Sequence, residues 1–220
     1  MIGRSRPSVL RQVVRLFLGR PELVESLTVI GGVAATLRLI ECGSPDVVRG
    51  TVDIDIVARP PITPEQLKSI VAPTRIDVLT IDASGMAGPL PKEVVDVVWL
   101  DRDVLAYEGA RVPVVGPIGL LVTKLNRSGT HGTRHARGRD LLDVALVLTE
   151  AAALSKSRFA QLRGLPVVAG AMADFAELMR GDTGAGVVEV VREMDADPNS
   201  MEFILFKARI DALLADLAVC

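Results

Sequence analysis

Two aspartates stand in a segment whose other residues favour a β-strand, "RGTVDIDIVAR" at residues 49–59. Val, Ile and Thr fit a pleated, half-buried surface, whereas Asp is depleted in strands. Successive side chains on a strand point to opposite faces, so Asp53 and Asp55 are expected on one face and the neighbouring isoleucines on the other. The pattern predicts a pair of carboxylates aimed at a single spot.

A third acid, Asp77, lies in the later strand-like segment "RIDVLT". If the two strands are neighbours, three carboxylates about 5 Å apart would repel one another by roughly 3 kcal/mol per pair. Cations would relieve that repulsion, and hard oxygen ligands select Mg²⁺ or Mn²⁺. Two such ions can align an attacking hydroxyl and polarise a phosphoryl group. The competing interpretation is a strand with one solvated face, since short D-x-D matches are common.

The segment "VIGG", residues 29–32, precedes the acidic strand. Gly31 and Gly32 could form only a tight strand–helix turn. The same turn would also let backbone amides at a helix N-terminus meet a triphosphate. Arg49 and Thr51, just before the acidic strand, could bind phosphate oxygens, or Arg49 could form a surface salt bridge.

Lys124 lies in the apolar helical segment "GLLVTKLNR". A lysine there is usually a snorkelling surface residue, and the alternative is a point charge that binds phosphate. Farther on, "RDLLD" carries Asp140 and Asp143 at i and i+3, on one helix face. Acids in a first helical turn are also favoured by the macrodipole, so we expect Asp140 in a site and leave Asp143 open.

One dense basic cluster follows Lys124. It could hold an RNA backbone or nucleotide phosphates, or it could be a solvated loop. The two histidines lie in a Gly-containing connector, predicted at 128–138, so no zinc site is inferred. The cluster consists of Arg127, His131, Arg134, His135, Arg137 and Arg139.

The elements that must position these residues follow from hydrophobic periodicity and turn signals. The expected helices are 8–19, 33–41, 64–71, one opening at Pro117, one over 139–154, and three more to the C-terminus. The expected strands are 26–30, the acidic strand, and 75–81, with 93–99 and 111–115 as further candidates. The organisation is an α/β half over 1–115, followed by a helical half over 116–220.

Composition limits the function classes. Basic and acidic side chains number 25 and 27, so no global attraction to nucleic acid or membrane is expected and any polyanion contact must be local. Aromatic residues make up 3% of the chain, which disfavours base-stacking platforms. No apolar run approaches the roughly 18 residues of a membrane span. The two cysteines, Cys42 and Cys220, form no metal-ligand spacing, and their sparse use suits the cytoplasm.

The order of the motifs resembles that of the nucleotidyltransferase-fold superfamily, and within it the AbiEii-type and MenT-like nucleotidyltransferases, many of them toxins of toxin–antitoxin pairs. The likeness rests on "VIGG", "RGTVDID", the strand acid Asp77, "KLNR" and "RDLLD", and it covers residues 29–148. Gly32 stands where polymerase-like members have serine, and the Lys124-to-Arg127 spacing is one residue tighter than usual.

The resemblance implies an α/β fold with a mixed sheet and flanking helices, completed by the helical C-terminal region. It implies transfer of a nucleoside monophosphate from an NTP to an acceptor hydroxyl. Asp53, Asp55 and Asp77 would hold Mg²⁺ or Mn²⁺, and Asp77 would also help to deprotonate the acceptor. Lys124 would neutralise the triphosphate, and Asp140 would orient that lysine or assist proton transfer.

The acceptor expected from the resemblance is RNA, at a tRNA 3′ end, with a protein hydroxyl as another candidate. A cognate antitoxin is an expected partner, and a membrane is not. Two alternatives remain open: a small-molecule nucleotidyltransferase, which would need an acidic acceptor pocket, and a catalytically silent nucleotide-binding scaffold.

Overall fold

A computed structural model describes residues 7–45, 53–59, 76–79, 90–131, 134–181 and 184–219. Its N-terminal half is built on a five-stranded sheet in the order β3-β2-β1-β5-β4. The sheet is mixed, because β1 pairs antiparallel with β2 and parallel with β5, while β2 pairs parallel with β3 and β4 antiparallel with β5. The strands are β1 (Leu27–Ile30), β2 (Ile54–Ala58), β3 (Ile76–Leu79), β4 (Arg102–Tyr107) and β5 (Ala110–Val115).

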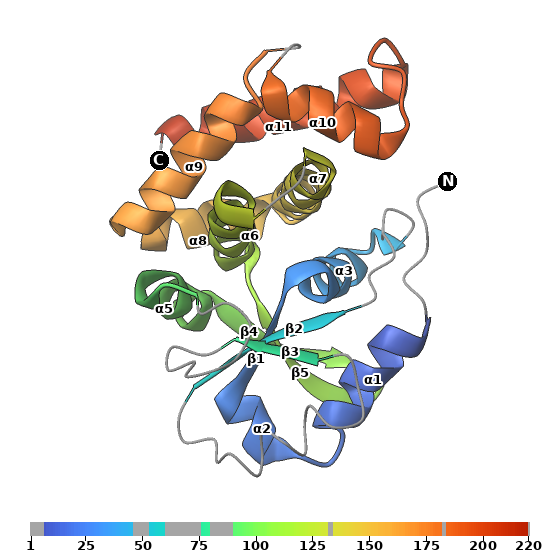
Figure 1. The fold of residues 1–220 in the computed structure, drawn as a ribbon, viewed down its shortest axis with the longest axis vertical. Helices are drawn as coiled ribbons and strands as arrows, with labels where there is room; N and C mark the ends of the chain where they lie inside the picture. The colour runs from blue at the N-terminus through green and yellow to red at the C-terminus, as the bar shows by residue number, and fades with distance from the viewer. Residues whose placement is uncertain are drawn as a thin grey trace.

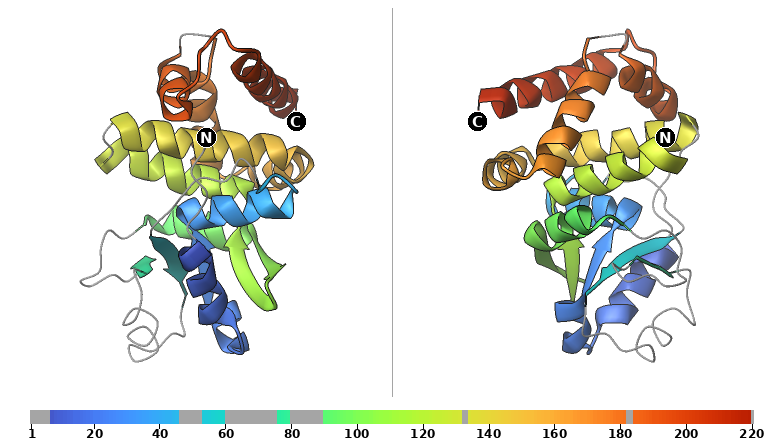
Figure 2. Two further views of the ribbon diagram at one scale, coloured as in Figure 1. Left: turned by 90° about the vertical axis from the view of Figure 1, so that its right-hand side faces the viewer. Right: turned by 60° about the vertical axis from the view of Figure 1, so that its left-hand side comes forward.

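Helices flank this sheet and then form the C-terminal half. Figures 1 and 2 show α1 and α2 at one end of the molecule and the last helices at the other, with α3, α6 and α7 between them and the sheet below α3. The helices of the first half are α1 (Pro7–Phe17), α2 (Pro21–Ser26), α3 (Gly31–Glu41) and α5 (Lys92–Leu100). Those that follow are α6 (Pro117–His131), α7 (Arg134–Glu150), α8 (Ala152–Leu162), α9 (Pro166–Leu178), α10 (Ala185–Met194) and α11 (Met201–Val219).

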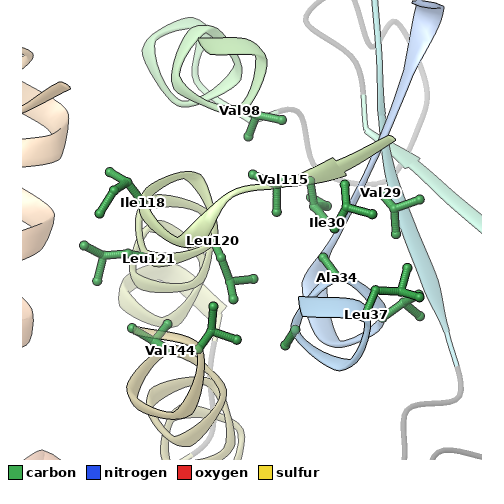
Figure 3. Close-up of a cluster of buried hydrophobic side chains, with 14 of the residues drawn as sticks. Val29, Ile30, Ala34, Leu37, Val98, Val115, Ile118, Leu120, Leu121 and Val144 are labelled. Carbon is green, nitrogen blue, oxygen red and sulfur yellow. The ribbon is translucent and has the colours of Figure 1, made fainter. Parts of the chain in front are cut away.

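The two halves share one hydrophobic core. Strand β1 is central in the sheet and all four of its residues are buried, as expected for a strand covered on both faces. Figure 3 shows Leu120 of α6 pointing toward Ala34 and Leu37 of α3, with Val144 of α7 on the same side as Leu120. Because α6 and α7 both contact α3, which itself contacts the sheet, the sheet and the first two C-terminal helices form one packed unit.

The predicted α/β half with a mixed sheet, followed by a helical half, is confirmed. The prediction of a strand at 93–99 was wrong, because α5 covers those residues. Its valines, 94, 95, 97 and 98, are all buried at helical spacing, and Lys92 pairs with Asp96 one turn away at 2.6 Å. Packing of that face outweighs the strand preference of β-branched residues.

Three further differences concern which elements form and where they begin and end. Strand β4 was not predicted, since this edge strand has a weak alternation of half-buried and exposed residues. The connector predicted at 128–138 is largely helical, because α6 extends to His131 and α7 begins at Arg134. Four helices follow α7, where three were predicted. The helix predicted at 64–71 lies outside the described residues. No described helix is both long and apolar enough to span a membrane.

Candidate active site

The junction between β1 and α3 places a glycine directly against an acid. Gly31 is the first residue of α3 and has φ +69°, in the region that favours glycine. A Cβ at this position would lie 2.2 Å from Asp55 Oδ2, which is far inside van der Waals contact. The N-cap residue of α3, Ile30, makes no side-chain hydrogen bond to the helix, and Gly32 is the second helical residue. The sequence therefore needs glycine at position 31 for the approach of the Asp55 carboxylate as well as for the turn.

Asp55 of β2 and Asp53, which directly precedes the strand, lie as the alternation predicted. Ile54 and Ile56 are fully buried, whereas Asp53 is exposed and Asp55 is half-buried. In the register of the sheet, Asp55 pairs with Ile30 on one side and with Asp77 on the other. The backbone thus brings the Asp55 and Asp77 positions together at the start of α3, although the side chain of Asp77 lies outside the described part.

A divalent cation fits the donor chemistry of this place, because carboxylate oxygens are the ligands that Mg²⁺ and Mn²⁺ prefer. The two described carboxylates, of Asp53 and Asp55, lie just before β2 and at its second residue. Among the described side chains, no group of three His, Cys, Asp or Glu forms a metal-binding set. For the third predicted ligand, Asp77, the structure describes the backbone position only.

Lys124 is buried and paired with two acids. Its side chain is 12% exposed, and Nζ lies 2.6 Å from Asp140 Oδ1 and 3.2 Å from Asp143 Oδ2. Burial lowers the pKa of Lys124, but attraction to Asp143 and Asp140 outweighs it, so the net shift of the pKa is upward. The ammonium therefore stays charged at neutral pH, and the interpretation of Lys124 as a snorkelling surface residue was wrong.

The structure also changes the interpretation of the two acids. Helix α7 begins at Arg134, so Asp140 and Asp143 lie beyond its first turn and the macrodipole does not explain them. Asp143, left open by the sequence, is the more buried partner of Lys124, with 8% of its side chain exposed against 21% for Asp140. Both acids reach the lysine because α6 and α7 pack side by side.

The basic cluster is described in part. The Arg139 guanidinium lies 3.3 Å from Glu193 of α10, so this arginine already has a protein partner. The side chains of Arg127, His131, Arg134, His135 and Arg137 lie outside the described part, as do Arg49 and Thr51 entirely.

One buried network of ion pairs was not predicted from the sequence. Arg38 of α3 is 1% exposed; it donates to the carbonyls of Val114 and Val115 and pairs with Asp103 at 2.8 Å. Arg158 of α8 pairs with the same Asp103, so the network links the helical half to the sheet. One arginine inside the apolar run "VAATLRLIE" was the available signal, because a charge inside a buried helix requires partners.

Asp101 adjoins this network and anchors the start of α6. It is fully buried, and its Oδ2 accepts the Gly119 N–H at 2.6 Å. Burial raises the pKa of Asp101 to about 6, against the opposing effects of the Gly119 hydrogen bond and of Arg158 and Arg38. The Asp101 carboxyl is therefore expected to bind a proton more tightly in the folded protein than in the unfolded chain.

This proton linkage gives a pH-dependent stability. Between about pH 4 and pH 6 the folded state holds the Asp101 proton that the unfolded state has lost, so the free energy of unfolding falls as pH rises. Relative to Asp101→Asn, the wild type should lose up to about 3 kcal/mol across that window. Chemical denaturation at several pH values measures the difference. Asp174→Asn, at an exposed position of α9, should show no such trend, and a pH-independent difference for Asp101→Asn would contradict the prediction.

Comparison with protein-family models, curated proteins and solved structures finds no match to this chain.

Proposed function

We propose that the chain is a metal-dependent nucleotidyltransferase, which moves a nucleoside monophosphate from an NTP to an acceptor hydroxyl and releases pyrophosphate. The observation that carries the proposal is the meeting of Gly31, Asp55 and the Asp77 position. A helix N-terminus, which suits phosphate groups, stands directly beside carboxylates, which suit the cations that accompany them.

Asp53, Asp55 and Asp77 would hold Mg²⁺ or Mn²⁺ in this proposal. When bound, such ions supply charge neutralisation at the phosphoryl group and lower the pKa of an attacking hydroxyl. The amides at the start of α3, from Gly31 and Gly32, would bind phosphate oxygens. Arg49 and Thr51 precede the acidic strand and would add donors from that side.

Lys124 would supply the positive charge for the triphosphate. Its pairing with Asp140 and Asp143 supports this role in two ways: the acids keep the ammonium protonated, and they fix its position in a buried setting. A phosphate arriving at Lys124 would share an ammonium that has three donors. Asp140, the more exposed of the two acids, is the one we assign to orienting the lysine during turnover.

The acceptor we favour is an RNA hydroxyl, as in the toxin-like enzymes that the motif order resembles. The basic residues around the α6–α7 junction support it, because arginines clustered in sequence suit a phosphodiester backbone. Arg139 contributes less than the sequence suggested, since Glu193 already neutralises part of its charge.

Metal-dependent NTP binding tests the site. Isothermal titration should show NTP binding more tightly with Mg²⁺ than with EDTA, by roughly tenfold or more, the effect of about 1.4 kcal/mol of binding free energy. Asp53→Asn combined with Asp55→Asn should remove that gain, because the amides cannot hold the cation, while Asp174→Asn should keep it. Equal, Mg²⁺-independent affinity in the wild type and the double variant would defeat the metal assignment.

A further inference from the structure

A cavity lies away from Asp53 and Asp55. It has a volume of about 450 Å³, within the range of small-molecule sites, and lies between α5 and the start of α9. Arg59 also lines this cavity. It directly follows β2 and comes four residues after Asp55 in the sequence. At about 3.3 Å per strand residue, Arg59 is roughly 13 Å from the acid, at the opposite end of the strand.

The walls of this cavity are mainly apolar. They include Leu100, Leu165, Pro166 and Val167, with the ring of Trp99 beside them. Leu100 is 57% exposed, so much of its apolar side chain is open to a ligand in the cavity. The cavity therefore offers an apolar body of moderate size a place to bury its surface.

Two hydrogen-bond donors, the Arg59 guanidinium and the Trp99 indole N–H, lie at one end of the cavity and have no acceptor among the described residues. Arg59 is exposed, its guanidinium lies 5.5 Å from the centroid of the Trp99 ring, and no described residue accepts a hydrogen bond from that guanidinium. The Trp99 indole N–H is buried and has no acceptor among the described residues either. A second guanidinium, of Arg102, lies 4.7 Å from the same ring but already donates to the Val24 and Glu25 carbonyls. This end is thus positive, and the described residues provide no acceptor for Arg59 or Trp99.

The two acids that line the cavity do not cancel this charge. Asp96 is paired with Lys92 at 2.6 Å. Glu93 lies in the first turn of α5, six residues before Trp99, which is about 9 Å along the helix axis. Among its described residues, the cavity therefore has an apolar wall and a positive end at Trp99, while the Glu93 position lies about two turns away along α5.

We propose that this cavity binds a small carboxylic acid with an apolar body, whose carboxylate pairs with the Arg59 guanidinium beside the Trp99 ring. A planar guanidinium matches a carboxylate with two parallel hydrogen bonds. This cavity is separate from the proposed nucleotide site, so the proposal does not depend on the nucleotidyltransferase activity.

Trp99 is the single tryptophan of the chain, so its fluorescence reports on this cavity directly. The probes are phenylbutyrate and phenylbutylamine, which share an apolar body and carry opposite charges. Phenylbutyrate should change the Trp99 emission saturably, and phenylbutylamine should bind about tenfold more weakly or not at all. Arg59→Gln should weaken phenylbutyrate binding by about tenfold, because a charge-assisted pair contributes roughly 1.5–3 kcal/mol.

Two further variants make the test specific. Arg111→Gln, at an exposed position of β5, should leave phenylbutyrate affinity unchanged, and Val167→Phe should abolish it by filling the cavity. Circular dichroism checks that each variant is folded. Equal or tighter binding of the amine, unchanged affinity in Arg59→Gln, or no saturable response to either probe would each overturn the proposal.

Discussion

Replacing Lys124 with alanine is expected to lower the free energy of unfolding by about 3 kcal/mol, because the change leaves two largely buried carboxylates without their counter-charge. Asp140 and Asp143 both lie within 3.2 Å of the ammonium, and the more buried of them is 8% exposed. Chemical denaturation at neutral pH measures the loss.

A matched lysine provides the control. Lys156 of α8 pairs with Asp216, but both side chains are about half exposed, so Lys156→Ala should cost no more than about 1 kcal/mol. Combining Lys124→Met with Asp140→Asn and Asp143→Asn should recover much of the lost stability, because the triple variant buries no unpaired charge. A loss for Lys124→Ala no larger than that for Lys156→Ala would contradict the buried ion cluster.

The same result matters for the proposed activity. A lysine that neutralises a triphosphate would contribute about 10²–10³ in rate, so Lys124→Ala should also lose turnover. Turnover must then be compared at equal folded fraction, since an unstable variant loses activity for a trivial reason.

Residues whose types conflict with their surroundings could be found in the sequence. Asp53 and Asp55 stood out because charges interrupt an apolar strand, and their exposure relative to Ile54 and Ile56 follows the alternation of a strand. The need for a turn at Gly31 was also predicted, but the second reason for glycine there was not. That glycine is required by the carboxylate of Asp55, which the register of two strands brings to it.

Properties that depend on helix packing could not be found that way. The residues alone left Lys124 open between a surface residue and a phosphate-binding one, and its pairing with Asp140 was expected only from the resemblance. The contact itself depends on how α6 packs on α7. The segment 93–99 looked like a strand, since its valines favour one locally and only the core reveals which spacing is buried. Arg38 was passed over for the same reason: its partners Asp103, Val114 and Val115 are remote in sequence.

The largest effect on activity is expected at the strand acids. If Asp53 holds a cation at the phosphoryl group, Asp53→Asn removes several kcal/mol of transition-state stabilisation, which corresponds to about 10³ or more in rate. Asp53 is exposed, so the same change should leave the fold intact. Loss of activity with unchanged stability would separate this residue from Lys124, where both are expected to fall.

The most direct test of the proposed function follows transfer itself. Total tRNA is incubated with the protein, Mg²⁺ and each α-labelled NTP in turn, and a parallel reaction offers cellular protein as the acceptor. We predict label in RNA with one base preferred, loss of that label in Asp53→Asn, and retention of it in Asp174→Asn. Label in protein alone would move the acceptor to a protein hydroxyl, and no label in either pool would contradict the RNA-directed nucleotidyltransferase.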